Sequence, residues 1–139
     1  MGAQLLAYPV LDFGTFATES YAKWGAGFGL DRDTMQWFWN LYLSSPNDGL
    51  SCYAAPMKAV DLSGLPATYI LSAKHDVLCD EGALYASRLR AAGVPVTFQE
   101  SDDMNHGFLY WVGALDRATQ ALEVASTWLK ANLQSTSPG

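Results

Sequence analysis

The chain has 139 residues, the size of a single domain, and a fold of that length buries roughly two thirds of the surface that the unfolded chain exposes. Half of the residues are hydrophobic and five are Trp, which excludes a disordered protein. A net charge of −6, with eight Lys and Arg in all, argues against a nucleic-acid partner, because binding to phosphates requires clustered basic residues. A small or neutral partner fits this composition better.

The sequence predicts neither a membrane span nor a secreted, disulfide-stabilised protein. No apolar run approaches the ~20 residues that cross a bilayer. Residues 1–4 lack the basic start of a secretory signal, so we expect a cytoplasmic protein. Cys52 and Cys79 are too few to form a disulfide framework.

The first half of the chain predicts one strand and two helices. Residues 4–10 contain an apolar run over 5–7 that is stopped by a proline at 9, which is typical of a short strand. Glycines mixed with aromatic residues over 12–30 indicate irregular structure around one short helix at about 20–24. The Asp and Thr side chains at 31–34 can accept hydrogen bonds from the free N–H groups of a first turn, so a helix is expected over 34–43.

The helix expected over 34–43 is apolar on nearly every side. A helix of this kind is either deeply buried or faces a ligand pocket or a partner. Its apolar residues are Met35, Trp37, Phe38, Trp39, Leu41, Tyr42 and Leu43.

The second half alternates between strand and helix patterns. The near-continuous apolar run over 67–73 is typical of a strand that is covered on both faces in a parallel sheet. Asp80 is expected to cap a helix that runs through 92, with Gly93 as the left-handed residue after it. The segments expected beyond it are a strand over 94–99, a loop over 100–107, a helix over about 113–133 and a frayed tail over 135–139.

An acid and a histidine follow successive strand segments of this α/β pattern. Asp76 closes the strand that begins at 67, and His106 lies 30 residues later, across one helix and one strand. Side chains at the carboxyl ends of parallel strands meet in one crevice, so these two are expected to form a hydrogen bond. They would supply two thirds of a Ser-His-Asp triad.

Three motifs resemble the α/β-hydrolase superfamily, and more narrowly its hormone-sensitive-lipase-like (bacterial type IV) carboxylesterases. They are Tyr8-Pro9-Val10-Leu11-Asp12, the run Asp76-Val77-Leu78-Cys79-Asp80-Glu81-Gly82, and Met104-Asn105-His106-Gly107-Phe108. The family usually reads Asp-Pro-Leu-Arg-Asp-Glu-Gly in the second motif and His-Gly-Phe in the third. The resemblance implies that Asp76 and His106 are catalytic residues.

The resemblance also implies an architecture: a three-layer, partial α/β-hydrolase fold with about three parallel strands, flanking helices and cap-type helices. Residues 13–50 would form the cap-like segment, and 51–134 the C-terminal catalytic-core segment. The resemblance covers only the C-terminal half of the family domain. A His-Gly-Gly oxyanion loop and a Gly-x-Ser-x-Gly nucleophile elbow do not occur in the sequence.

Less specific interpretations of these residues remain open. Asp76 could cap a helix, and His106 could satisfy a turn. A zinc site built from His75, Asp76, Cys79 and His106 lacks any paired ligand motif, and we expect neither metal nor cofactor. Ser51 and Cys79 are weak candidates for a nucleophile, because neither stands in an elbow motif.

Three hypotheses about function follow. The first is a carboxylic ester hydrolase acting on a small hydrophobic ester, with Trp37, Phe38 and Phe108 as candidate pocket residues. The second is a non-catalytic protein that associates with itself, and the third is a half-enzyme completed by another chain. A homodimer or other homo-oligomer is expected for two reasons. The strand over 4–10 would have an open edge, and the helix over 34–43 cannot bury Trp37, Phe38 and Trp39 together.

Overall fold

A computed structural model describes residues 2–14 and 16–134 as a three-stranded parallel sheet between helices. The strands are β1 (Ala3–Ala7), β2 (Ala67–His75) and β3 (Val96–Asn105), in the order β1-β2-β3. This is the partial α/β sheet that the sequence predicts.

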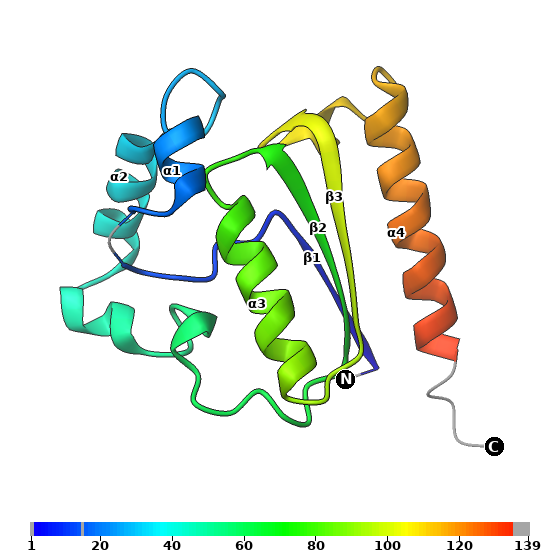
Figure 1. Ribbon diagram of the computed structural model, residues 1–139, viewed down its shortest axis with the longest axis horizontal. Helices are drawn as coiled ribbons and strands as arrows, with labels where there is room; N and C mark the ends of the chain where they lie inside the picture. Colours follow the sequence, from blue (N-terminus) through cyan, green and yellow to red (C-terminus); the bar gives the residue numbers. More distant parts are fainter. Residues whose placement is uncertain (1, 15, 135–139) are drawn as a thin grey trace.

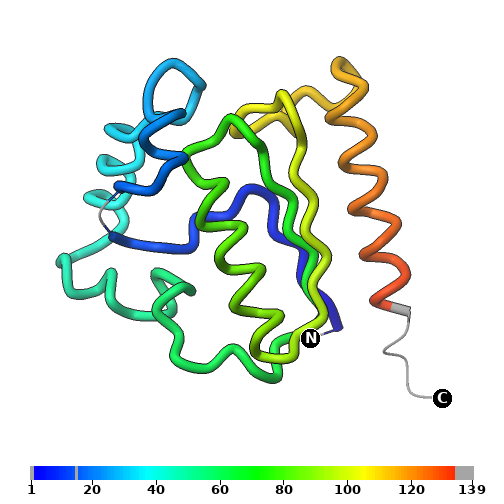
Figure 2. Tube along the Cα trace, in the orientation of Figure 1, coloured from blue at the N-terminus to red at the C-terminus, as the bar shows by residue number. Residues whose placement is uncertain are grey.

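The helices form two layers around the sheet. In Figure 1, α3 (Cys79–Ala91) covers one face of the sheet and α4 (Asp116–Gln134) the other, while α1 (Glu19–Trp24) and α2 (Arg32–Tyr42) lie together beyond α3. Figure 2 shows the segment after β1 running past α3 toward these two short helices. The described residues also form the 3-10 turns η1 (Pro46–Leu50), η2 (Pro56–Lys58) and η3 (Phe108–Trp111).

Strand β2 is the centre of the core, because both of its neighbours are strands and both of its faces are covered by helices. Ile70 belongs to the cluster on the α3 side, whereas Tyr69 and Leu71 belong to the cluster on the α4 side. All three are at most 1% exposed. Burial on both faces explains the near-continuous apolar run in this segment.

The prediction of a loop over 100–107 is wrong, because β3 continues to Asn105. The pairing Ala73↔Ser101 is followed by an irregularity, after which His75 pairs with Asn105. This stretch is rich in acidic and amide side chains, which is usual in a loop but is also tolerated on a strand at the edge of a sheet. The strand therefore lacks the apolar alternation by which sequence patterns identify strands.

Two predicted helix starts are also corrected. Asp31 caps α2 by accepting a hydrogen bond from the Thr34 N–H at 2.7 Å, so the helix begins at Arg32 and not at Thr34. Asp80 does not cap α3: Leu78 stands at the cap, and the Asp80 carboxylate lies inside the first turn.

Gly93 has the predicted left-handed conformation, with φ at +80°. The last helix begins at Asp116, three residues after the expected position. The expected tail over 135–139 lies outside the described residues.

Helix α2 is buried on one side only, so the first of the two predicted alternatives, a deeply buried helix, is wrong. Met35 and Trp39 face a cluster that includes Val77 and Leu78 and are at most 5% exposed. The rest of the helix leaves large apolar side chains open to solvent. These are Trp37, Phe38, Leu41 and Tyr42, which are 56%, 47%, 66% and 67% exposed.

Candidate active site

Strand register places Asp76 beside His106. His75 at the end of β2 pairs with Asn105 at the end of β3. Asp76 and His106 directly follow these two residues. Asp76 Oδ2 and His106 Nδ1 lie 2.7 Å apart, within hydrogen-bonding distance. The structure thus brings together the two side chains that the sequence predicts to meet.

The carboxylate of Asp76 is buried and held from several directions. It is 1% exposed, and its Oδ1 accepts a hydrogen bond from the Leu78 N–H at 3.0 Å. Helix α1 supports the same loop, because the Ser20 hydroxyl donates to the Val77 carbonyl at 2.6 Å and the Ser20 N–H donates to Asp80 Oδ2 at 2.8 Å. A carboxylate held in this way can fix the orientation of a histidine.

The imidazole of His106 retains a face open to solvent, and its side chain is 27% exposed. Gly107 follows it with φ at +79°, a conformation that favours glycine and turns the chain into η3. The ring of Tyr8 lies against the imidazole, with ring centroids 4.6 Å apart. Because Nδ1 faces Asp76, Nε2 is the nitrogen available for proton transfer.

A buried acid, Glu81, anchors the segment after β1 to helix α3. Its Oε2 accepts hydrogen bonds from the backbone N–H groups of Leu11 at 3.2 Å and Asp12 at 2.7 Å. The Asp12 carboxylate in turn lies 2.7 Å from the Lys58 ammonium. Burial raises the pKa of Glu81 to about 8, although the two backbone donors oppose this shift.

The sequence prediction assigned no role to Glu81 or Tyr8. Both lie in motifs that carry the family resemblance, so membership of these motifs was the signal that could have identified them.

The two weak candidates for a nucleophile lie elsewhere. Cys79 is buried, and its pKa is raised to about 11, first by burial and then by the charges of nearby acids, including Asp80. Its thiol is therefore protonated at neutral pH, and a thiol is a poor nucleophile. Ser51 is exposed and accepts a hydrogen bond from the Tyr53 N–H at 3.3 Å. Among the described hydrogen bonds, His106 is joined to neither.

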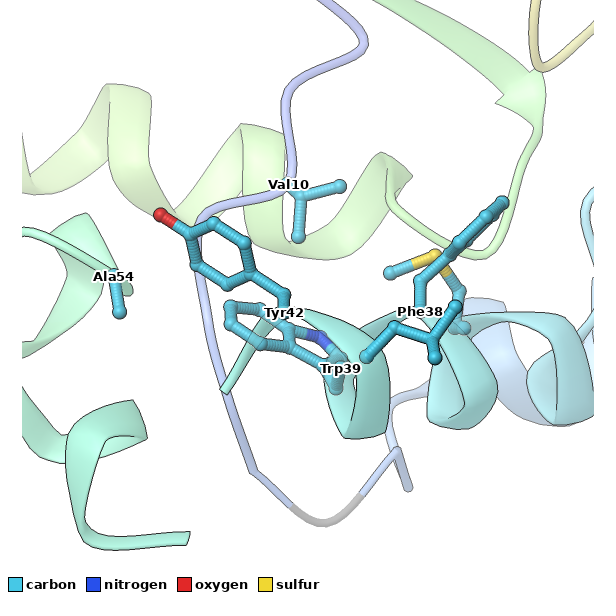
Figure 3. A pocket seen from close by; sticks show the side chains of 7 residues that line it. Val10, Phe38, Trp39, Tyr42 and Ala54 are labelled. Atoms are coloured by element: carbon cyan, nitrogen blue, oxygen red, sulfur yellow. The ribbon is translucent and has the colours of Figure 1, made fainter. Parts of the chain in front are cut away.

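An apolar groove of about 570 Å³ lies between α2 and the segment after β1. Figure 3 shows Val10 pointing toward the rings of Trp39 and Tyr42 across it. The lining residues are Val10, Met35, Phe38, Trp39, Leu41, Tyr42 and Ala54.

Of the three predicted pocket residues, Phe38 lines this groove. Trp37 contacts Phe38 in a tilted arrangement, with ring centroids 5.2 Å apart, and is not part of the lining. Phe108 is 3% exposed and belongs to the core cluster between the sheet and α4.

Residues 2–14 and 16–134 contain no cluster of three or more His, Cys, Asp and Glu side chains that could hold a metal ion. No helix in the same residues has the length and hydropathy that a membrane crossing requires.

Comparison with known proteins gives consistent matches. Residues 1–110 match the alpha/beta hydrolase fold family. The chain is 41% identical over 107 residues to the carboxylic ester hydrolase LipN of Mycobacterium tuberculosis, covering 76% of this chain and 28% of that protein. It is 28% identical over 130 residues to an ethyl acetate hydrolase of Pseudomonas putida, covering 94% of this chain and 41% of that protein.

Solved structures show the same likeness. EstE1, a thermostable carboxylesterase from a metagenomic library, superposes with a TM-score of 0.91 at 32% identity, over 95% of this chain and 45% of that one. A thermostable esterase from Pseudomonas putida superposes with a TM-score of 0.88 at 37% identity, over 94% of this chain and 42% of that one. The chain spans less than half the length of these relatives. It belongs to the α/β-hydrolase fold family, in the hormone-sensitive-lipase-like branch that its motifs resemble.

Proposed function

We propose that this chain supplies the acid and the base of a carboxylic ester hydrolase. The observation that supports this most directly is the 2.7 Å contact between His106 Nδ1 and the buried Asp76 carboxylate at the ends of two paired strands. Names of relatives such as carboxylic ester hydrolase and carboxylesterase point to the same reaction.

In the proposed mechanism, His106 Nε2 takes the proton of a serine hydroxyl as the oxygen attacks the ester carbonyl. The same proton passes to the leaving alcohol, and a water molecule then releases the acid by the same route. Asp76 accepts the Nδ1 hydrogen, holds the tautomer and stabilises the imidazolium that forms between these steps.

The nucleophile and the oxyanion donors would come from a segment outside these 139 residues. The sequence contains neither a Gly-x-Ser-x-Gly elbow nor a His-Gly-Gly loop, and Ser51 and Cys79 are not joined to His106. β1 is the strand beside which such a segment would add, because among the described residues it pairs only with β2.

The groove between α2 and Val10 is the proposed site for the apolar part of a small ester. Its lining is almost entirely hydrophobic, which suits an acyl chain better than a charged substrate. Phe38 is the residue of the predicted pocket set that we retain, since it lines the groove and stays 47% exposed.

The experiment is an esterase assay on the purified chain, alone and mixed with a polypeptide from a relative that carries the elbow and the oxyanion loop. The substrate is p-nitrophenyl butyrate, and a fluorophosphonate probe read by intact mass reports an activated serine. We expect the chain alone to be nearly inactive and unlabelled, because removing one oxyanion donor alone already lowers the rate roughly 10²–10³-fold.

In the mixture, His106→Ala should abolish both hydrolysis and labelling. His75→Ala is the matched control, because His75 contacts Trp24 and Phe28 and lies next to the pair without belonging to it. Activity that survives His106→Ala would contradict the proposal. Rapid hydrolysis by the chain alone would instead indicate an unrecognised nucleophile, with Ser51 and Cys79 as the first positions to mutate.

A non-catalytic, self-associating protein is the second candidate. The outer edge of β1, which pairs with no strand of the described part of the chain, favours it, and so do the exposed apolar side chains of α2. A second copy can bury both surfaces. Failure of every mixture to hydrolyse esters, together with a stable homo-oligomer, would support this function over the first.

A further inference from the structure

Tyr8 has an unusual backbone conformation at the carboxyl end of β1. Its φ is +35°, in the left-handed region that residues other than glycine rarely adopt. The conformation is held in the sheet, because the Tyr8 N–H donates to the Leu71 carbonyl at 2.6 Å. Strained backbone of this kind persists only where the surrounding structure enforces it, and it is frequent at functional sites.

This conformation directs the aromatic ring of Tyr8 at His106. The two ring centroids are 4.6 Å apart with planes inclined by 59°. The Tyr8 ring also contacts Phe108 edge to face at 5.8 Å, and Phe108 is fixed in the core. The imidazole is therefore bounded by Asp76 at Nδ1 and by an aromatic ring that has its own buried support.

These two contacts restrict different motions of His106. The hydrogen bond to Asp76 fixes which nitrogen points into the protein, but the ring can still rock about that bond. An aromatic surface beside the imidazole opposes such rocking, and small errors in the placement of a general base reduce its rate strongly.

We infer that Tyr8 is a positioning residue for His106, which acts by confining the imidazole so that Nε2 keeps a fixed direction. The inference rests on the proposed function for its catalytic meaning. The role belongs to the ring and not to the hydroxyl, since the ring makes both aromatic contacts.

Three variants distinguish the effect of the Tyr8 ring from the effect of the strained backbone at this position. Tyr8→Phe keeps the ring, whereas Tyr8→Asn removes it and places a residue that tolerates positive φ better than most. Tyr8→Leu keeps apolar bulk and serves if Tyr8→Asn does not fold. Tyr53→Asn is the matched control, because Tyr53 is 93% exposed in a turn outside the site.

The first measurement uses the 139-residue chain labelled with 15N-histidine and observes His106 by NMR. We expect the same protected Nδ1–H resonance in the wild type, Tyr8→Phe and Tyr53→Asn. Tyr8→Asn and Tyr8→Leu should lose this protected resonance. A His106 spectrum unchanged in both ring-deleted variants overturns the inference.

The second measurement uses the mixture with the elbow-bearing polypeptide. Tyr8→Asn should lower kcat roughly tenfold or more with KM unchanged, and Tyr8→Phe should restore kcat. A rise in KM alone would contradict a positioning role. If no mixture is active but the His106 spectrum responds as expected, the proposed function fails while the role of Tyr8 stands.

Discussion

The two oxygens of Asp76 have different hydrogen-bond donors, His106 at Oδ2 and the Leu78 N–H at Oδ1. An amide has one oxygen and one NH2 group, so it cannot accept from both donors with separate oxygens. In Asp76→Asn the NH2 group must therefore face either the His106 ring nitrogen or the Leu78 N–H. We expect the free energy of unfolding to fall by about 1–3 kcal/mol, or the tautomer of His106 to switch so that Nδ1 accepts. Urea unfolding and histidine 15N shifts measure the two effects.

Asp33→Asn is the control for that substitution, because Asp33 is an exposed acid in the first turn of α2. Its stability and the His106 spectrum should both stay close to the wild type. An Asp76→Asn protein that matches Asp33→Asn in both measurements would refute the bidentate role of Asp76.

Glu81 makes the stability depend on pH. Its pKa is about 8 in the folded protein, above the ordinary 4.5. Between pH 4.5 and 8 the folded protein therefore holds a proton on Glu81 that the unfolded chain has released. The stabilisation of the folded state by this proton is complete below about pH 4.5 and is lost as the pH rises to 8. We therefore expect the free energy of unfolding to fall between pH 5 and 8, by up to a few kcal/mol.

Glu81→Gln should remove that dependence, because a glutamine oxygen can accept from Leu11 and Asp12 at any pH. Glu123→Gln, an exposed change on α4, should keep the wild-type slope. Urea unfolding at several pH values distinguishes them. Equal slopes in all three proteins would show that the Glu81 carboxyl group is not protonated in the fold.

At the scale of elements, helix α1 is short and depends on side-chain contacts to stay on the protein. Ser20 is 1% exposed and donates to the Val77 carbonyl at 2.6 Å. Ser20→Ala leaves that buried carbonyl without the hydroxyl, so we expect unfolding free energy to fall by about 1–3 kcal/mol. Ser87→Ala on the exposed face of α3 should change it little, and denaturant unfolding of both variants decides the point.

Sequence patterns identified the strands and helices whose burial follows a regular period. β2 and α3 were predicted because an apolar run and a glycine stop are local signals, and Asp76 and His106 were found through the strand ends. The end of β3 was missed because its pairing with β2, and not its own composition, makes it a strand. Tyr8 was missed because its backbone conformation and its contact with His106 arise only in the folded chain.

At the scale of the whole molecule, the two edges of the sheet differ. The β3 edge carries Glu100, Asp102 and Asp103 beside an irregular pairing, which discourages addition of another strand. β1 has no charged residue and is half-buried along its length. The edge of β1 and the exposed Leu41 on α2 are two separate surfaces that a second copy could cover.

We expect light scattering after size exclusion to report about twice the chain mass at micromolar concentration, since two-fold dimers are the commonest homo-oligomers. Leu41→Glu should shift the protein toward monomer, because a carboxylate would be buried in the apolar contact. Leu84→Glu is the control, at another exposed leucine, on α3. A wild-type monomer at high concentration would contradict this expectation.

The irregular pairing near the end of β3 also determines which changes in chain length the protein can tolerate. Between the pairs Ala73↔Ser101 and His75↔Asn105, β3 uses two more residues than β2. Because that excess is even, side chains beyond it keep the face they would otherwise have. If the intact chain continued from Ala73↔Ser101 in a regular register, His75 would pair with Asp103, and His106 would lie two residues, about 6.6 Å, farther along the strand from Asp76. The two extra residues therefore bring His106 back beside Asp76. Changes of length in the turn after α3 leave this register untouched and should be tolerated more readily than changes that remove the irregularity.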